Sequence, residues 1–211
     1  MKHFVFCHGF GFDISFWHKL EPYFSGYKVS FLDLGYLGNK TTIDIDKNDT
    51  IIAVGHSLGL IKLLDLPKID YLIGINSFVN FCGIHHELRS ARQKELVAFK
   101  NNILLNPKLA FKKFYIRCGA YDLYEDMNWD RLNLDLILQD LDLLASCNVS
   151  LTHSTLFIST LDDIVVPQSV LRDNFSNIEN AHLVNLQSGK HALGYVHPND
   201  VFTHIMDYVD A

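Results

Sequence analysis

The chain has 211 residues, of which 48% are hydrophobic and 20% are charged, and its formal net charge at pH 7 is −6. A chain of this length and apolar content can bury a core large enough to fold without disulfides or a structural metal, which argues against disorder. The acidic balance argues against nucleic acid as the main partner, because phosphate recognition requires a basic surface.

The cysteines and the N-terminus favour an intracellular protein. No two cysteines have CxxC spacing, so we expect buried free thiols in a reducing cytosol. Gly9 and Gly11 end the N-terminal apolar stretch too early for a signal peptide, and no run approaches the roughly 18 apolar residues of a membrane span. We therefore expect a cytoplasmic protein with no membrane partner, and we expect it to be a monomer. The cysteines are Cys7, Cys82, Cys118 and Cys147.

Six short runs rich in β-branched and aromatic residues predict strands. Most of the runs are almost continuously apolar rather than alternating, which is typical of strands buried on both faces of a parallel sheet. They span residues 3–7, 28–32, 50–54, 71–75, 155–159 and 182–186.

Helical patterns lie between and after these runs. They cover residues 16–24, 58–65, 168–175 and 198–209. The alternation of strand and helix predicts an α/β fold with a mostly parallel sheet of about six strands, flanked by helices and joined by right-handed crossovers.

One long segment, from about residue 78 to about residue 150, contains no convincing strand. Within it, Asn106 followed by Pro107 marks a helix start, because an amide side chain can cap the helix and Pro is favoured at its first position. Apolar residues then recur at helical spacing, and they do so again from Leu134 onward. We therefore expect a single domain over residues 1–211 with a helical lid inserted at about 78–150.

The stretch Gly55-His56-Ser57-Leu58-Gly59 lies between a predicted strand and a predicted helix. In a tight strand-to-helix turn, glycines two residues before and after a serine remove side chains that would collide. Such a turn also places the hydroxyl at a helix N-terminus, where amides and the helix dipole favour negative charge. Ser57 is therefore a candidate nucleophile. The alternative is an ordinary turn rich in Gly and Ser.

A serine nucleophile needs a base, and a third group must orient that base. In the expected chain order the acid follows the serine and the histidine comes last. Asp163 lies in the spacing D-x-x-V-P after the fifth run and is favoured over its neighbour Asp162. His191 lies in the loop between the last strand and the last helix. The weaker candidates for the base lie within or beside predicted elements: His182, His197 and His204.

The oxyanion of an acyl-transfer reaction needs hydrogen-bond donors. We expect one from the backbone N–H of Leu58, directly after the serine. The second is expected from the N–H of Phe10, in the glycine-containing loop after the first strand.

Taken together, these four motifs resemble those of the α/β-hydrolase superfamily over essentially the whole chain. They are His8-Gly9-Phe10-Gly11, the GHSLG stretch, Asp163-x-x-Val166-Pro167 and Gly189-Lys190-His191-Ala192. The resemblance implies a sheet capped by a helical lid, with no cofactor and no metal. The predicted lid and the HGFGFDISFW segment are also similar to the pimeloyl-acyl-carrier-protein methyl ester esterases of biotin synthesis (the BioH family). Two features depart from the pattern, a shortened N-terminal segment and the unusual loop DLGYLGNK.

Charge is unevenly distributed along the expected lid. Between Arg89 and Arg117 the sequence has eight basic residues and one acidic residue. A basic lid on an acidic protein would attract an acidic partner, and acyl carrier protein is one. The alternative is a solvated helix face balanced by the acidic stretch 122–142. The candidate docking residues are Arg89, Arg92, Lys112, Lys113 and Arg117, of which Lys113 and Arg117 share a helix face.

The sequence therefore predicts a serine carboxylesterase, with Phe10, Leu58 and Phe114 lining the substrate cavity. The favoured substrate is the methyl ester of pimeloyl-acyl-carrier protein. Other candidates on the same triad are a short-chain esterase, a thioesterase and a carbon–carbon bond hydrolase. From a different class, a non-catalytic binding protein that retained the fold is the alternative.

Overall fold

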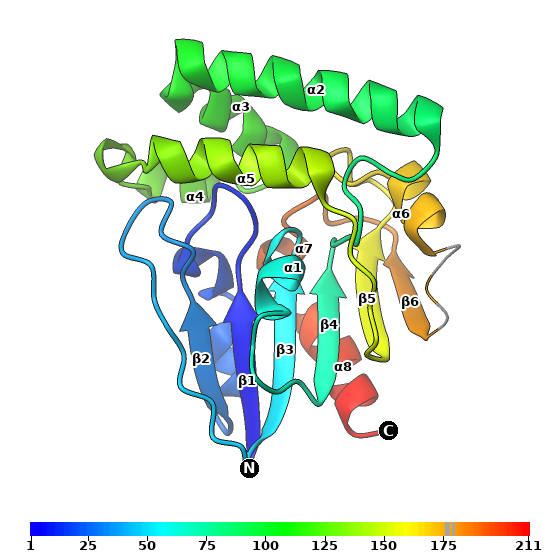
Figure 1. The fold of residues 1–211 in the computed structure, drawn as a ribbon. Helices are drawn as coiled ribbons and strands as arrows, with labels where there is room; N and C mark the ends of the chain where they lie inside the picture. The colour runs from blue at the N-terminus through cyan, green and yellow to red at the C-terminus, as the bar shows by residue number, and fades with distance from the viewer. Residues whose placement is uncertain (176–177, 179) are drawn as a thin grey trace.

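The structure is a computed structural model that describes residues 1–175, 178 and 180–211, and in this part of the chain it contains a six-stranded, wholly parallel sheet (Figure 1). The strand order is β2-β1-β3-β4-β5-β6. The strands are β1 (Lys2–Cys7), β2 (Lys28–Leu32), β3 (Thr50–His56), β4 (Tyr71–Ile75), β5 (Thr155–Thr160) and β6 (Ala181–Leu186). The α/β prediction and all six predicted strands are confirmed.

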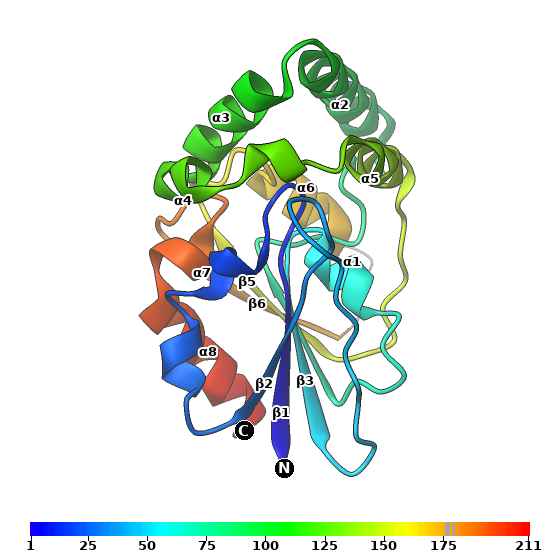
Figure 2. The same ribbon diagram turned by 90° about the vertical axis from the view of Figure 1, so that its left-hand side faces the viewer.

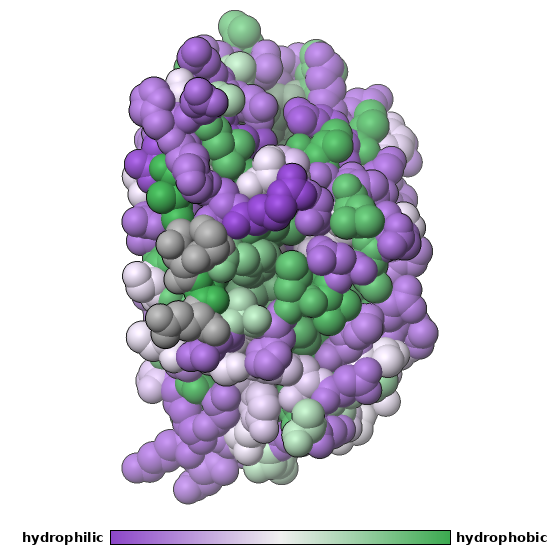
Figure 3. Space-filling view, turned by 90° about the vertical axis from the view of Figure 1, so that its right-hand side faces the viewer, coloured by the Kyte–Doolittle hydropathy of each residue, from purple (hydrophilic) through white to green (hydrophobic). Residues whose placement is uncertain are grey.

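Burial of the strands follows their place in the sheet. The inner strands β1, β3, β4 and β5 are buried almost throughout, as their apolar runs predict. The edge strands are only partly buried, so the expectation of two buried faces is wrong for β2 and β6. Leu183 on β6 is 43% exposed, and the β6 side of the molecule shows hydrophobic side chains gathered among hydrophilic ones (Figure 3).

The register of the sheet brings the carboxyl ends of the inner strands together. Cys7 of β1 pairs with Gly55 of β3. Ile75 of β4 pairs with His56 of β3 on one side and with Ile158 of β5 on the other. Residues that directly follow these strands therefore meet at one edge of the sheet, where ligands bind in open α/β folds.

Helices cover both faces of the sheet. Figure 2 shows α7 (Leu193–Val196) and α8 (Pro198–Val209) on one side and α1 (Gly59–Leu63) on the other. The helix α6 (Gln168–Phe175) follows β5. The predicted helices 168–175 and 198–209 agree with α6 and α8 residue for residue.

The single helix predicted over 16–24 is wrong. Two 3-10 turns, Ile14–Trp17 and Glu21–Phe24, take its place. Pro22 lies at the start of the second turn and has no backbone N–H with which to extend the first.

The helix predicted over 58–65 is shorter than expected, because α1 spans only Gly59–Leu63. Pro67 follows closely, and a proline disfavours the helical conformation of the residue before it. A helix this short has a small dipole. The predicted contribution of a helix dipole at Ser57 is therefore small.

Four helices and a 3-10 turn lie over the carboxyl ends of the strands (Figure 1). They are α2 (His86–Leu105), α3 (Pro107–Cys118), α4 (Tyr121–Asp126), the turn Trp129–Arg131 and α5 (Leu134–Ser146). The predicted start of α3 is confirmed, because the Asn106 side chain accepts a 3.0 Å hydrogen bond from Leu109 N. Helix α2 packs against both α3 and α5. The division of the chain into one domain and a lid stays a prediction.

The prediction of buried free thiols is confirmed for Cys7, Cys82, Cys118 and Cys147, whereas the reducing compartment stays a prediction. Within the described residues, no helix has both the length and the apolar character needed to cross a membrane.

Candidate active site

Ser57 lies in the turn between β3 and α1, where its φ is +52°. This left-handed conformation is costly for a residue with a side chain, and such strain is concentrated at functional sites. A Cβ atom on Gly55 would lie 2.3 Å from Leu60 N, and one on Gly59 would lie 2.3 Å from Cys7 O. Both glycines are thus required by close backbone approach, and the predicted sharp turn is confirmed.

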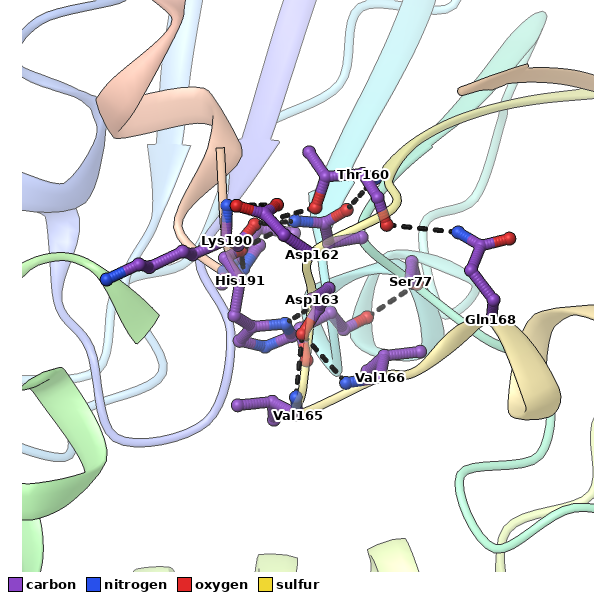
Figure 4. A network of polar contacts seen from close by, with 12 residues as sticks. Ser77, Thr160, Asp162, Asp163, Val165, Val166, Gln168, Lys190 and His191 are labelled. Carbon is purple, nitrogen blue, oxygen red and sulfur yellow. Dashed lines mark hydrogen bonds and ion pairs between the residues drawn. The ribbon is translucent and has the colours of Figure 1, made fainter. Parts of the chain in front are cut away.

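His191 and Asp163 form a buried pair at the same edge of the sheet (Figure 4). His191 Nδ1 lies 2.8 Å from Asp163 Oδ2, and the two residues are 1% and 3% exposed. Asp163 Oδ1 accepts hydrogen bonds from Val165 N at 2.7 Å and Val166 N at 2.9 Å. Because a carboxylate accepts, the geometry assigns the proton to Nδ1 and leaves Nε2 free to act as a base.

The neighbouring Asp162 has a different place. It is exposed, and its carboxylate accepts hydrogen bonds from Lys190 N at 2.9 Å and from Gly189 N at 3.4 Å. Asp162 therefore holds the backbone of the loop after β6 that carries His191 (the histidine loop), whereas Asp163 contacts the imidazole ring of His191. The structure favours Asp163 as the partner of His191.

Ser57 and His191 line the same cavity, which has a volume of about 390 Å³. Phe10 and Phe114 also line it, as predicted. In the described part of the chain, no hydrogen bond joins Ser57 Oγ to His191 Nε2. Catalytic hydrogen bonds are often long before substrate binds, so this geometry is compatible with a serine–histidine pair.

Leu58 does not line the cavity with its side chain, which is 0% exposed in the core, so its predicted contact with substrate is wrong. Its backbone remains suitable for the other predicted role. Among the described residues, the N–H groups of Leu58 and Phe10 have no acceptor. The loop that carries Phe10 packs against the serine, since a Cβ on Gly9 would lie 2.9 Å from Ser57 Cβ. The two amides therefore belong to residues next to the candidate nucleophile or to its contacting loop, and their oxyanion role stays a prediction.

His56 is buried beside this pair. Its Nε2 lies 2.9 Å from the backbone oxygen of His191, and its ring stacks on Phe16 with the centroids 4.2 Å apart. Burial and the neighbouring His191 hold the pKa of His56 well below its ordinary value. A neutral His56 must carry its proton on Nε2, because the partner is a carbonyl oxygen.

Backbone strain is concentrated at this edge of the sheet. Three non-glycine residues of the described chain have a positive φ: Ser57 at 52°, Asn76 at 44° and Lys190 at 51°. They follow β3, β4 and β6, respectively. Sequence reasoning missed Asn76. The available signal was a polar residue directly after an inner strand, next to the strand that carries the serine.

Arg92 is buried and does not belong to a docking surface. It is 6% exposed, and its guanidinium lies 4.4 Å from the centroid of the Phe81 ring. Its Nη1 donates to Glu95 Oε2 at 2.5 Å, and its Nη2 donates to the carbonyl oxygen of Val165 at 2.5 Å. The prediction of Arg92 as a carrier contact is thus wrong, because this face of α2 is turned inward. Sequence reasoning missed its contact with the loop that holds Asp163.

The other basic residues of the lid remain accessible to different extents. Lys113 and Arg117 are exposed and line the cavity, and Lys112 is exposed with Nζ 5.5 Å from the Tyr121 ring. Within the described chain none of these three forms an ion pair. Arg89 is half-buried and donates to a backbone carbonyl.

Two further lid lysines, by contrast, are neutralised by the acidic stretch. Lys100 pairs with Asp142 at 2.7 Å, and Lys108 pairs with Asp130 at 2.9 Å. The alternative of a balanced, solvated helix face therefore describes part of the lid.

No family model and no curated protein sequence matches the chain. Several solved structures do. The esterase EaEST from Exiguobacterium antarcticum is similar with a TM-score of 0.78 and 13% identity, over 100% of this chain and 92% of that one. Bromoperoxidase from Bacillus anthracis is similar with a TM-score of 0.75 and 14% identity, over 100% of this chain and 92% of that one. A thermophilic esterase from Thermogutta terrifontis is similar with a TM-score of 0.73 and 14% identity, over 100% of this chain and 90% of that one. The chain has the α/β-hydrolase fold.

Proposed function

We propose that the chain is a serine hydrolase that cleaves carboxylic esters. The observation that carries this proposal is the buried His191–Asp163 pair, 2.8 Å apart, at a cavity that Ser57 also lines. The strained backbone of Ser57 adds support, because it is the conformation expected of a nucleophilic serine at a sharp strand-to-helix turn. Several proteins of similar fold are esterases by name, which agrees with this chemistry.

The proposed reaction has two halves. Ser57 Oγ attacks the ester carbonyl while His191 Nε2 takes the hydroxyl proton, and the tetrahedral oxyanion is held by the amides of Phe10 and Leu58. The C–O bond then breaks, and His191 returns the proton to the departing alkoxide, which leaves as an alcohol. Water attacks the acyl-enzyme with His191 again as the base, releasing the acid and regenerating Ser57. Asp163 fixes the imidazole tautomer and stabilises the imidazolium.

The cavity supports an apolar acyl group as the part of the substrate next to the ester. Its volume of about 390 Å³ lies in the range of small-molecule sites. Its apolar lining includes Phe81, Leu96, Phe99, Leu141 and Leu144. The lid helices α2 and α5 supply most of these side chains, so the lid would set the acyl length.

The proposed specific substrate is the methyl ester of pimeloyl-acyl-carrier protein. It is supported by the similarity of the lid sequence to that esterase family, and by Lys113 and Arg117 at the cavity, where they can meet an acidic carrier. The test is complementation of a biotin auxotroph that lacks its pimeloyl-ester esterase. Growth with the wild-type chain and none with Ser57→Ala is expected. No growth with either, alongside esterase activity in vitro, would reject this substrate and leave the esterase.

Hydrolysis of p-nitrophenyl esters of increasing acyl length tests the broader proposal. The wild-type chain should turn them over, and Ser57→Ala should lower kcat by about 10⁴-fold or more. A preference for matching thioesters would indicate a thioesterase instead. No turnover of any ester or thioester would favour the non-catalytic binding protein.

A further inference from the structure

Asn76 directly follows β4 and is 1% exposed. Its side-chain Nδ2 donates to the carbonyl oxygens of Lys190 at 2.6 Å and His191 at 2.9 Å. Its Oδ1 accepts from Thr160 N at 3.1 Å. The amide therefore uses both donor hydrogens and its acceptor, which leaves the side chain a single orientation.

These contacts link the loop after β5 that carries Asp163 (the acid loop) with the histidine loop. The proposed reaction requires the two loops to keep a fixed position relative to each other. Thr160 is the last residue of β5, three residues before Asp163. Lys190 and His191 belong to the loop after β6. Asn76 is thus a bridge between the start of the acid loop and the backbone of the histidine.

A second donor acts on the same carbonyl. His191 O accepts from His56 Nε2 at 2.9 Å as well as from Asn76 Nδ2. Two donors from β3 and from the end of β4 fix the main chain of His191 in two directions. The main chain sets where the ring of His191 is attached, and the hydrogen bond to Asp163 sets how the ring is turned, so both determine the position of Nε2 relative to Ser57.

The backbone of Asn76 also supports a positioning role. Its φ is +44°, a conformation that asparagine tolerates better than most residues with a side chain. Asn76 N donates to Ile158 O at 2.8 Å, which anchors the strained residue to β5. Strain of this kind persists only where the surroundings determine it fully, and it is concentrated at active sites.

We propose that Asn76 is a positioning residue of the hydrolase, which sets the reach of His191 toward Ser57 by bridging the acid and histidine loops. This inference rests on the proposed function. Asn76 contacts the backbone of His191 and is not among the residues that line the cavity, so its loss should slow the chemical step and leave substrate binding unchanged.

Two variants test the proposal. Asn76→Asp keeps the size and the acceptor but places carboxylate oxygen against two carbonyl oxygens. Asn76→Gly keeps the positive φ and removes the side chain. Each should lower kcat for a p-nitrophenyl ester by about 10- to 100-fold with KM unchanged, because a misplacement of about 1 Å has an effect of this size. Labelling of Ser57 by a fluorophosphonate should slow by a similar factor.

Asn174 supplies a matched control. It is also 1% exposed, and within the described residues the hydrogen bonds of its side chain go to main-chain atoms, as those of Asn76 do. Its Oδ1 accepts from Val79 N and Asn80 N, each at 2.8 Å, and its Nδ2 donates to Asn80 O and Val170 O, each at 2.9 Å. None of these partners lies in the acid or histidine loop. Asn174→Asp should therefore lower the unfolding temperature but leave kcat per folded molecule near the wild-type value.

The outcomes separate this inference from the proposed function. Wild-type kcat in both Asn76 variants, or an equal loss of kcat in Asn174→Asp, would overturn the positioning role while the esterase stands. If the wild-type chain hydrolyses nothing, the proposed function fails. Proton NMR then tests whether Asn76 positions His191 by bridging the two loops. The downfield signal of the His191 Nδ1 proton, assigned by its loss in His191→Gln, should shift in the Asn76 variants and not in Asn174→Asp. An unchanged signal in the Asn76 variants would overturn the bridge as well.

Discussion

His191 Nδ1 and Asp163 Oδ2 lie 2.8 Å apart in a pocket where both side chains are almost wholly buried. The carboxylate has two further hydrogen bonds from the backbone of its own loop, so it presents a fixed acceptor to the ring. This relationship fixes the tautomer on which a serine-activating base depends.

Replacing the acid by its amide should remove that control. In Asp163→Asn the amide can offer an N–H to Nδ1, which moves the ring proton to Nε2, so His191 can no longer accept the serine proton. We expect kcat for a p-nitrophenyl ester to fall by about 10³- to 10⁴-fold with the fold preserved. The adjacent Asp162→Asn keeps an oxygen for Lys190 N, the closer of its two backbone donors, and its kcat should fall by less than about 10-fold. Equal losses in the two variants would contradict the assignment of the acid.

Arg92 links the predicted lid to the acid loop, so its replacement should lower both stability and activity. Its Nη2 bonds Val165 O, two residues from Asp163, so Arg92→Met leaves a carbonyl unpaired beneath the lid. We expect the free energy of unfolding to fall by about 1–3 kcal/mol and kcat to fall with it. Arg89→Met is the control, because Arg89 lies on the same helix α2 but donates to Gly83 O, which precedes that helix and is not part of the loop that carries Asp163. Urea unfolding and steady-state kinetics measure both. Loss of kcat in Arg89→Met to the same extent would exclude a specific link through Arg92.

A docking role for the lid predicts that activity depends on the substrate's carrier. Reversing the charge at Lys113 and Arg117 should slow hydrolysis of a carrier-linked ester and spare a small p-nitrophenyl ester, since only the former presents an acidic surface. The same reversal at Lys40 and Lys47, exposed lysines in the loop after β2, is the control and should affect neither substrate. Equal loss on both substrates in the lid variant would show that these residues shape the cavity instead.

The burial of His56 should make the stability of the fold depend on pH. Burial holds its pKa well below the ordinary value, so the folded protein keeps it neutral, whereas the unfolded chain gains a proton there below about pH 6.5. The unfolded state then binds more protons, and the free energy of unfolding falls as the pH decreases from 7 to 5. In His56→Gln the decline should be shallower by up to about 1.4 kcal/mol per pH unit. Urea unfolding at pH 7, 6 and 5 measures both slopes, and parallel slopes would refute a neutral buried His56.

Much of the fold and of the candidate site could be predicted from the sequence, because buried strands require apolar runs and the site residues follow those runs directly. The apolar runs that become strands are short and bounded, so their limits fall within two residues of the observed ones. The residues of the candidate site follow strands, and parallel strands bring their carboxyl ends to one edge. The pairing of Asp163 rather than Asp162 with His191 followed from spacing in the same way.

What the sequence could not predict depends on tertiary contacts. The charge of Arg92 suggested solvent, but a cation can be buried when a carboxylate, a carbonyl and an aromatic ring surround it. Leu58 was expected in the cavity, but the sharp turn directs its side chain into the core. Asn76 was missed because a single asparagine after a strand is ambiguous until the loops from other strands are seen to meet it.

In the proposed mechanism, Ser57 is a nucleophile that His191 activates. Treatment with a fluorophosphonate, followed by intact-mass and peptide measurements, is the decisive test of both roles. We expect one phosphonyl group per chain, located on Ser57, absent in Ser57→Ala and formed far more slowly in His191→Ala. A folded wild-type chain that gains no label would refute the nucleophile, and labelling of Ser57 at an equal rate in His191→Ala would refute its activation by His191.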